Sequence, residues 1–278
     1  MCRATNAESS QRRRRGLTLL ELMIAMSVST ILVGALAVLA SATRQTSDFN
    51  SGQSAAVQHA RVVHERLQRF VGEAYATETY PGVVVVDETV SGHRYCDTVV
   101  IWHPSGAPTN AAGPPLVNEL IIIGPDPTDP RRLMEFTAPT DARTIQLNDA
   151  SLNTTSGRTL IGSIKAASTT IKTLLTPLVR TASTGNGSTS SLRAAVRFEC
   201  ELHPTTAEMT SHRGGSLAWE DVAWPQGWFS TSCGMRQIWL RSELQLVSEE
   251  YNEDGTLPAT AIGLPFLGSA TNYYNLTQ

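Results

Sequence analysis

The chain is poor in cysteine. It has 4 cysteines among 278 residues, and Cys2 lies within the first 16. Cys96, Cys200 and Cys233 remain, an odd number, so at most one intramolecular bridge forms among them. With 41% hydrophobic and 17% charged residues, the composition is typical of a packed core of ordinary size in one main soluble domain.

Positive charge is scarce beyond residue 16. Residues 1–16 contain five arginines and one acidic residue, Glu8. Removing them lowers the totals from 22 basic and 25 acidic residues to 17 and 24, and the formal net charge from −3 to −7. Because the remaining chain is acidic and has no basic stripe, nucleic acid is not expected as its main partner.

Two further absences mark the N-terminal part. No charged residue occurs from Leu22 to Thr43, a run of 22 residues. As a helix this run is roughly 33 Å long, enough to cross a bilayer core of about 30 Å. No proline lies between residues 17 and 80, so nothing forces a break in the helix. The arginines before the run predict a cytoplasmic N-terminus, with everything after Arg44 on the far side of the membrane.

One carboxylate, that of Glu21, lies at the start of this apolar run. An unpaired carboxylate is costly there, although a side chain so near the end of the run can also reach the lipid headgroups. An ordinary secretory signal has a shorter apolar core and a cleavage site beyond it, whereas the natural processing point here, Gly16, lies before the run. Cleavage after Gly16 gives Leu17 a free α-amino group. We expect Glu21 to pair with such an amine on a neighbouring subunit.

Residues 15–25, Arg-Gly-Leu-Thr-Leu-Leu-Glu-Leu-Met-Ile-Ala, resemble the N-terminal motif of type IV pilins and type II secretion pseudopilins. In that family a prepilin peptidase cuts after the glycine and methylates the new N-terminus. The resemblance implies that Gly16 precedes the cut, that Leu17 is the first mature residue, where the family usually has phenylalanine, and that Glu21 is the fifth. It also implies prepilin peptidase, other pilin-like subunits and the inner membrane as partners.

The resemblance and the patterns together divide the chain into four parts. These are a basic leader (1–16), a transmembrane and assembly helix (17–43), an amphipathic stalk helix (44–80) and a β-rich head (81–278). An apolar stripe recurs through the stalk at steps of four and three, which predicts one buried helix face: Ala56, Ala60, Val63, Leu67, Phe70 and Ala74. Pro81 and Gly82 are expected to end a helix of some 55–60 residues.

The head alternates short apolar runs with turn residues, which predicts an antiparallel sheet. We expect strands in Val83–Val86, Thr98–Trp102, Leu120–Ile123, Leu133–Phe136, Leu192–Leu202 and Arg236–Val247. Thr159–Leu178 has a more helical pattern, and Thr181–Ser191 is rich in Gly, Ser and Thr, as flexible loops are. The result is an α+β fold with a long N-terminal helix packed on an antiparallel sheet. The size of the head and the stretch Gln58–Phe70 resemble minor subunits, either PilW-type minor pilins or J-type pseudopilins.

Candidate sites in the head have ordinary structural explanations. Cys200, His203, His212 and Cys233 have no compact metal-module spacing, so a Cys200–Cys233 disulfide is preferred to zinc. Acidic turns at Asp126 and Asp129, and at Glu253 and Asp254, are compatible with calcium but are interpreted as solvated turns, and no cofactor is predicted. An aromatic segment forms either a core lid or a docking surface: Trp219, Trp224, Trp228 and Phe229.

No pattern of catalytic residues is present. Ser216 lacks the context of a nucleophile elbow, and His59 and His64 are five residues apart without a metalloprotease glutamate. The sequence therefore predicts a structural protein and not an enzyme. The competing hypothesis is a membrane-tethered binding module that never polymerises and binds a ligand through residues 219–229.

Overall fold

The computed structural model describes residues 18–77, 79–90, 92–111, 113–184, 191–218, 221–222 and 235–275. By internal contacts the chain divides into two units, residues 1–51 and residues 52–278. The helix α1 (Leu19–Gly72) contributes residues to both.

In the first unit, every described side chain is exposed. Large apolar side chains follow one another along the helix from Leu19, 77% exposed, to Leu39, 63% exposed. A helix that is apolar on all sides and covered by no other part of its own unit needs an apolar environment. The length and the apolar composition of this part of α1 agree with the predicted membrane-spanning stretch.

In the second unit, one face of α1 is buried. The predicted stripe is confirmed, since Ala56, Ala60, Val63, Leu67, Phe70 and Ala74 are each at most 8% exposed. Val71, which the stripe did not include, is fully buried beside them. These side chains form one core cluster with residues of two β-sheets.

The helix ends at Gly72, eight residues before the predicted end at residue 80. Glycine loses more conformational freedom in a helix than any other residue, so it is a natural end point. Beyond it the backbone of Tyr75 donates to the Trp102 carbonyl oxygen at 2.8 Å, and the Tyr75 ring meets the Trp102 ring edge to face, with centroids 4.8 Å apart. These contacts with a strand replace the helical hydrogen bonds.

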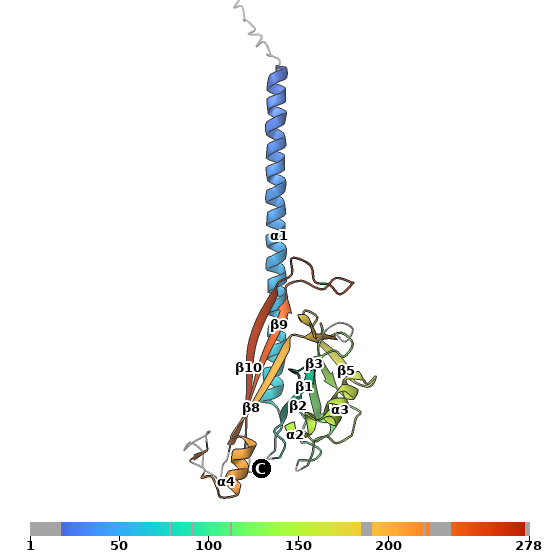
Figure 1. The fold of residues 1–278 in the computed structure, drawn as a ribbon, viewed down its shortest axis with the longest axis vertical. Helices are drawn as coiled ribbons and strands as arrows, with labels where there is room; N and C mark the ends of the chain where they lie inside the picture. Colours follow the sequence, from blue (N-terminus) through green and yellow to red (C-terminus); the bar gives the residue numbers. More distant parts are fainter. Residues whose placement is uncertain are drawn as a thin grey trace, which may run out of the picture. The chain divides into compact units, whose positions relative to one another are not determined.

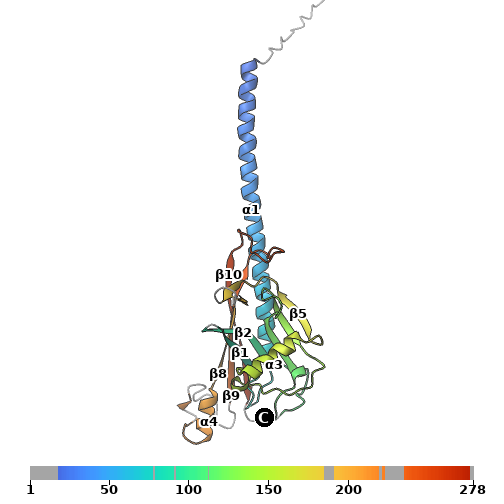
Figure 2. The same cartoon turned by 45° about the vertical axis from the view of Figure 1, so that its right-hand side comes forward.

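The first sheet has five antiparallel strands in sequence order (Figures 1 and 2). They are β1 (Val83–Val90), β2 (His93–Trp102), β3 (Leu120–Pro125), β4 (Leu133–Thr137) and β5 (Ile171–Thr176). One face packs on the α1 stripe. The other face packs on Leu152 of the short helix α2 (Asp149–Leu152) and on Ile161 and Ile164 of α3 (Thr155–Ala166). A one-turn 3-10 helix, η1 (Val117–Glu119), leads into β3.

The second sheet has three antiparallel strands in the order β10-β9-β8. They are β8 (Val196–His203), β9 (Met235–Val247) and β10 (Gly263–Asn275). Ile238, Leu240, Leu244 and Leu246 of β9 are buried against α1, as their alternation predicted. The helix α4 (Thr206–Arg213) follows β8. The α+β fold, a long apolar helix followed by an antiparallel β head, is thus confirmed.

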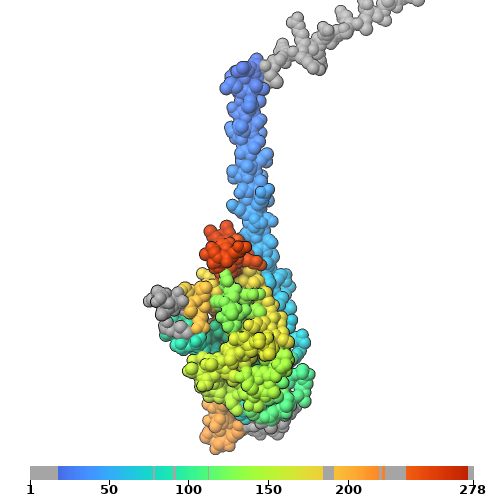
Figure 3. Space-filling model, turned by 90° about the vertical axis from the view of Figure 1, so that its right-hand side faces the viewer, coloured from blue at the N-terminus to red at the C-terminus, as the bar shows by residue number. Residues whose placement is uncertain are grey.

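Two predictions for the middle of the head were wrong. Only the first part of Thr159–Leu178 is helical, because α3 ends at Ala166 and β5 then pairs with β4. Four of the six residues from Thr169 to Leu174 are β-branched, and they favour a strand. The predicted loop Thr181–Ser191 is wrong at its two ends, where β6 (Thr181–Thr184) pairs with β7 (Ser191–Ala194), while residues 185–190 lie outside the described residues. Figure 3 shows the face of the head to which α3 and β5 contribute, in yellow and green.

Candidate functional site

The N-terminal candidates are described from Thr18 onward, because Gly16 and Leu17 lie outside the described residues. Thr18 precedes the first helical residue, and Glu21 is the third residue of α1. The Glu21 Oε2 atom accepts from the Thr18 N–H at 2.9 Å and from the Thr18 Oγ1 hydroxyl at 3.1 Å. In return, the Glu21 N–H donates to Thr18 Oγ1 at 3.2 Å. This reciprocal pair is a capping box.

The capping box fixes where the Glu21 carboxylate lies. It holds the carboxylate over the first turn, where the positive end of the helix dipole stabilises a negative charge. Both bonds that the carboxylate accepts use Oε2, and no bond to Oε1 occurs among the residues that the structure describes. The arrangement can bind a cation at the exposed end of an apolar helix.

Thr18 is the residue that the sequence analysis missed. The signal was present, because Thr18-Leu19-Leu20-Glu21 has the Thr-x-x-Glu spacing of a capping box ahead of an apolar run. The run was interpreted only as a membrane stretch. The start of the helix was therefore predicted from the absence of charged residues and not from the capping motif.

We expect Thr18→Ala to loosen the first turn of α1. Losing an N-cap side chain costs about 1 kcal/mol, so the amides of the first turn should exchange with solvent roughly five times faster. Thr18→Ser should keep the wild-type rate, because serine can make the same two bonds. Hydrogen exchange followed by mass spectrometry in detergent measures this. Thr43→Ala is the control, since the Thr43 hydroxyl donates only to Leu39 O at 2.9 Å in mid-helix. Equal exchange in all three variants would contradict the capping role.

Membrane insertion is supported by the same helix. Leu19–Gly72 contains a window with a mean hydropathy of 2.4 and none of its residues buried, and it is long and apolar enough to cross a membrane. A helix of this kind near the N-terminus is also found in signal sequences, so the residues before it decide between the two.

The family model of the prokaryotic N-terminal methylation motif matches residues 11–37. This is the N-terminus of a type IV pilin-like precursor. The match joins the arginine-rich leader, Gly16, Glu21 and the apolar run in one motif, and such precursors are processed by prepilin peptidase. The precursor is therefore a membrane-anchored, single-pass protein. Neither the comparison with curated proteins nor the comparison with solved structures gives a match.

The cysteine and histidine candidates lie in the head of the precursor. Cys96 and Cys200 are not bonded to each other, and Cys200 Sγ lies 3.8 Å from the Val83 carbonyl oxygen. Burial raises the pKa of Cys200 to about 12, so its thiol stays protonated. Cys233 lies outside the described residues, and the Cys200–Cys233 disulfide stays a prediction. His203 contacts Glu201, and His212 contacts the Leu217 carbonyl oxygen.

The acidic turn residues use their carboxylates locally. Asp126 accepts from the backbone and the hydroxyl of Thr128 at 3.0 and 2.8 Å. Asp129 pairs with Arg131 at 2.6 Å, and Asp254 caps its turn through Thr256 at 2.9 Å. Among the described residues, no group of three His, Cys, Asp or Glu is arranged to hold a metal ion. Contrary to the solvated-turn interpretation, Asp126 is buried, 8% exposed.

The remaining candidates are the aromatic segment, one serine and two histidines. Trp219, Trp224, Trp228 and Phe229 lie outside the described residues, so both interpretations of that segment stay open. Ser216 donates its hydroxyl to the Ser211 carbonyl oxygen at 2.9 Å. The His64 ring packs so closely on Gly268 that a Cβ there would lie 2.4 Å from the ring. His59 is only partly buried.

A buried lysine was not foreseen. Lys165 of α3 is 8% exposed, and its Nζ atom lies 3.5 Å from Thr98 Oγ1 and 5.3 Å from the centre of the Phe136 ring. No carboxylate lies within ion-pair distance of it among the residues described. Burial lowers the pKa of Lys165 to about 8, and the charges of Asp97 and Asp126 oppose this shift.

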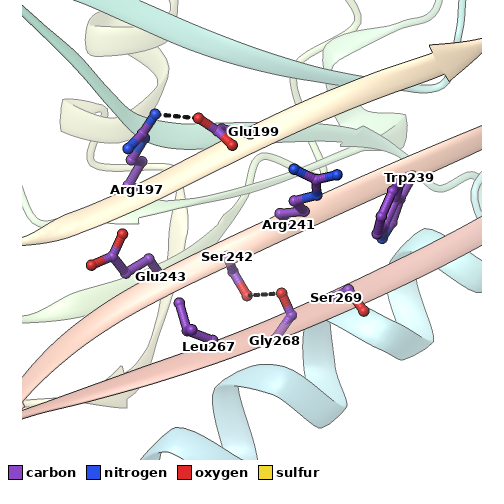
Figure 4. Close-up of a pocket in the computed structure, with 9 residues that line it drawn as sticks. All are labelled: Arg197, Glu199, Trp239, Arg241, Ser242, Glu243, Leu267, Gly268 and Ser269. Atoms are coloured by element: carbon purple, nitrogen blue, oxygen red, sulfur yellow. Dashed lines mark hydrogen bonds and ion pairs between the residues drawn. The ribbon is translucent and has the colours of Figure 1, made fainter.

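The outer face of the second sheet carries a shallow hollow (Figure 4). Arg241 stacks over the Trp239 ring, with its guanidinium carbon 4.1 Å from the ring centre. On the neighbouring strand β8, Arg197 and Glu199 form an ion pair with each other. Leu267 of β10 borders the hollow and is 78% exposed, more than any other large apolar side chain among the described residues of the head.

Proposed function

We propose that this precursor is a minor pilin or pseudopilin: a structural subunit of a type IV filament or of a type II secretion pseudopilus, and not an enzyme. One observation carries the proposal. The methylation motif over residues 11–37 coincides with a carboxylate, that of Glu21, held at the start of an exposed apolar helix. The minor-subunit assignment rests on the size of the head, which exceeds what a major subunit needs.

The mechanism is electrostatic and mechanical. The apolar helices leave the bilayer and bundle with one another, so that their exposed side chains exchange lipid for neighbouring helices. A free amine and a free carboxylate are both costly inside such a bundle, and pairing them removes most of that penalty. Glu21 of one subunit neutralises the α-amine of Leu17 in the next. Its Oε2 atom stays in the capping box while Oε1 faces the neighbour.

The basic leader also sets the orientation of the chain in the membrane. The leader arginines keep the N-terminus in the cytoplasm, and the head lies beyond the inner membrane until assembly. The partners are prepilin peptidase, the inner membrane and other pilin-like subunits. A plain membrane anchor has no use for the loss of its basic leader, so processing separates this proposal from the tethered binding module.

We expect cleavage between Gly16 and Leu17, with a methyl group added to the Leu17 amine. Intact mass spectrometry of the membrane-extracted protein measures both changes. Gly16→Val should leave the leader attached, because the peptidase requires the small residue before the cut. Gly34→Val is the control, since a side chain at Gly34 meets nothing within 4 Å and should leave cleavage unchanged. A mature wild-type protein that retains Arg12–Arg15 would rule out the proposed function.

A further inference from the structure

A cleft with a volume of about 400 Å³ lies beside α3 in the head. Its walls come from β1, β2, the turn that follows β3, the helix α3 itself and β7. A cleft of this size is large enough to enclose a small organic molecule. It shares no residue with the N-terminal motif or with the hollow beside Trp239.

The cleft is rich in charge, and both of its arginines are neutralised within the protein. Arg158 lies 3.6 Å from a carboxylate oxygen of Asp87. Arg193 lies 2.7 Å from a carboxylate oxygen of Glu88. These two ion pairs leave three charged side chains among the described lining residues, one lysine and two aspartates.

The lysine of the cleft, Lys165, is a buried cation that no carboxylate contacts. In the described part of the chain its only hydrogen bond is the one to Thr98 Oγ1, at 3.5 Å, so two of its three donor hydrogens have no partner. Burial lowers the pKa of Lys165 to about 8, and the amine is therefore still protonated at neutral pH. A buried ammonium group is costly unless it is paired, so Lys165 is suited to hold the anionic group of a ligand.

The two aspartates of the cleft, Asp126 and Asp97, have oxygen atoms left for a ligand. Asp126 is 8% exposed and accepts both bonds from Thr128 through Oδ1, while Oδ2 accepts none from the described residues. Burial raises the pKa of Asp126, but the bonds from Thr128 outweigh burial and keep the pKa below its usual range, so the group is ionised. Asp97 accepts only from the Thr98 hydroxyl, at 2.9 Å, among the residues described. Both carboxylates are therefore suited to hold a cationic group.

We propose that this cleft binds a small zwitterion of the α-amino acid class, with the carboxylate of the ligand on Lys165 and its ammonium group on Asp97 and Asp126. The mixture of charges favours this class, because the two aspartates repel a plain anion and the lysine repels a plain cation. A zwitterion supplies the counter-charge that each group lacks. Leu192 also lines the cleft and is 56% exposed, so an aliphatic side chain on the ligand has an apolar contact. The inference goes beyond the proposed function and does not depend on leader cleavage.

Isothermal titration calorimetry of the full-length protein in detergent tests the site, with L-leucine as the probe. Two matched probes each lack one of its charges: isocaproate has no ammonium group, and isoamylamine has no carboxylate. L-Leucine should bind at one molecule per chain and about tenfold or more tighter than either matched probe, because it alone pairs with both kinds of charge. No binding of L-leucine at millimolar concentration would overturn the proposal. So would a matched probe that binds as tightly as L-leucine.

Variants of the cleft locate the binding. Lys165→Met and Asp126→Asn each remove one charge and should each weaken L-leucine binding about tenfold or more, and asparagine keeps an oxygen that can accept the bonds from Thr128. Lys172→Met is the matched control, because Lys172 is exposed on β5 and does not line the cleft, and it should bind like the wild type. Circular dichroism checks that every variant folds. Wild-type binding by both cleft variants, or an equal loss in Lys172→Met, would overturn the proposal. Glu21→Val should bind L-leucine like the wild type, so this result is separate from filament assembly.

Discussion

Glu21→Val should abolish or strongly reduce incorporation of the subunit into filaments, while leaving membrane insertion and leader cleavage intact. Valine favours the membrane interior more than an ionised carboxylate does, so insertion should not suffer. In the assembled bundle, however, the Leu17 amine of the neighbour would lose its counter-charge. Removing one partner of a buried ion pair typically costs 3–5 kcal/mol, which corresponds to a loss of at least a hundredfold in incorporation.

Two matched variants separate the charge from the helix cap. Glu21→Gln keeps a side-chain oxygen that can cap Thr18 but removes the negative charge, so it should fail like Glu21→Val. Thr18→Ala breaks the capping box but keeps the charge, so it should assemble at close to the wild-type level. Sheared filaments or purified tip complexes, compared with total membrane protein on immunoblots, measure incorporation. Wild-type incorporation of Glu21→Gln would show that Glu21 acts only as a helix cap.

The long-range organisation of the chain was predictable because it depends on simple periodicities. A run without charge, a four-and-three stripe and alternating strands are each set by local chemistry, and burial of Val63 and Leu240 follows from them. The N-terminal motif was equally clear, since it joins a glycine, a glutamate at fixed distance and an apolar run. Family recognition and fold class therefore came from the first 75 residues and from the strand pattern.

The errors arose where tertiary pairing overrides weak local signals. Ile171 and Leu174 have helical spacing with the preceding helix, but both are exposed on β5, whose backbone is fixed by β4. The strand β10 was not predicted at all, because Gly263, Pro265 and Gly268 interrupt its apolar residues. A continuous antiparallel pairing with β9 over thirteen residue pairs outweighs the low strand propensity of these residues. The buried Lys165 depends on the volume above Gly124, which no local pattern reveals.

Lys165→Met should stabilise the head at neutral pH. The pKa of Lys165 is lowered from 10.5 to about 8 because burial penalises the charged form, so the fold favours the neutral amine. Below pH 8 the lysine is protonated in both the folded and the unfolded state, and the penalty is fully present. As the pH rises from 8 to 10.5, the folded state loses the proton first and the penalty disappears. At 1.36 kcal/mol per pKa unit, the full penalty is about 3 kcal/mol.

The expected result is therefore a pH-dependent difference between variant and wild type. Lys165→Met should raise the free energy of unfolding by about 3 kcal/mol at pH 7, and the gain should shrink toward zero near pH 10.5. Urea unfolding followed by far-ultraviolet circular dichroism measures it. Lys172→Met is the matched control, because Lys172 lies 5.9 Å from the centre of the same Phe136 ring but on the exposed part of β5, and its removal should change little at any pH. A destabilised Lys165→Met would mean that the attraction of Asp97 and Asp126 outweighs the burial of the charge.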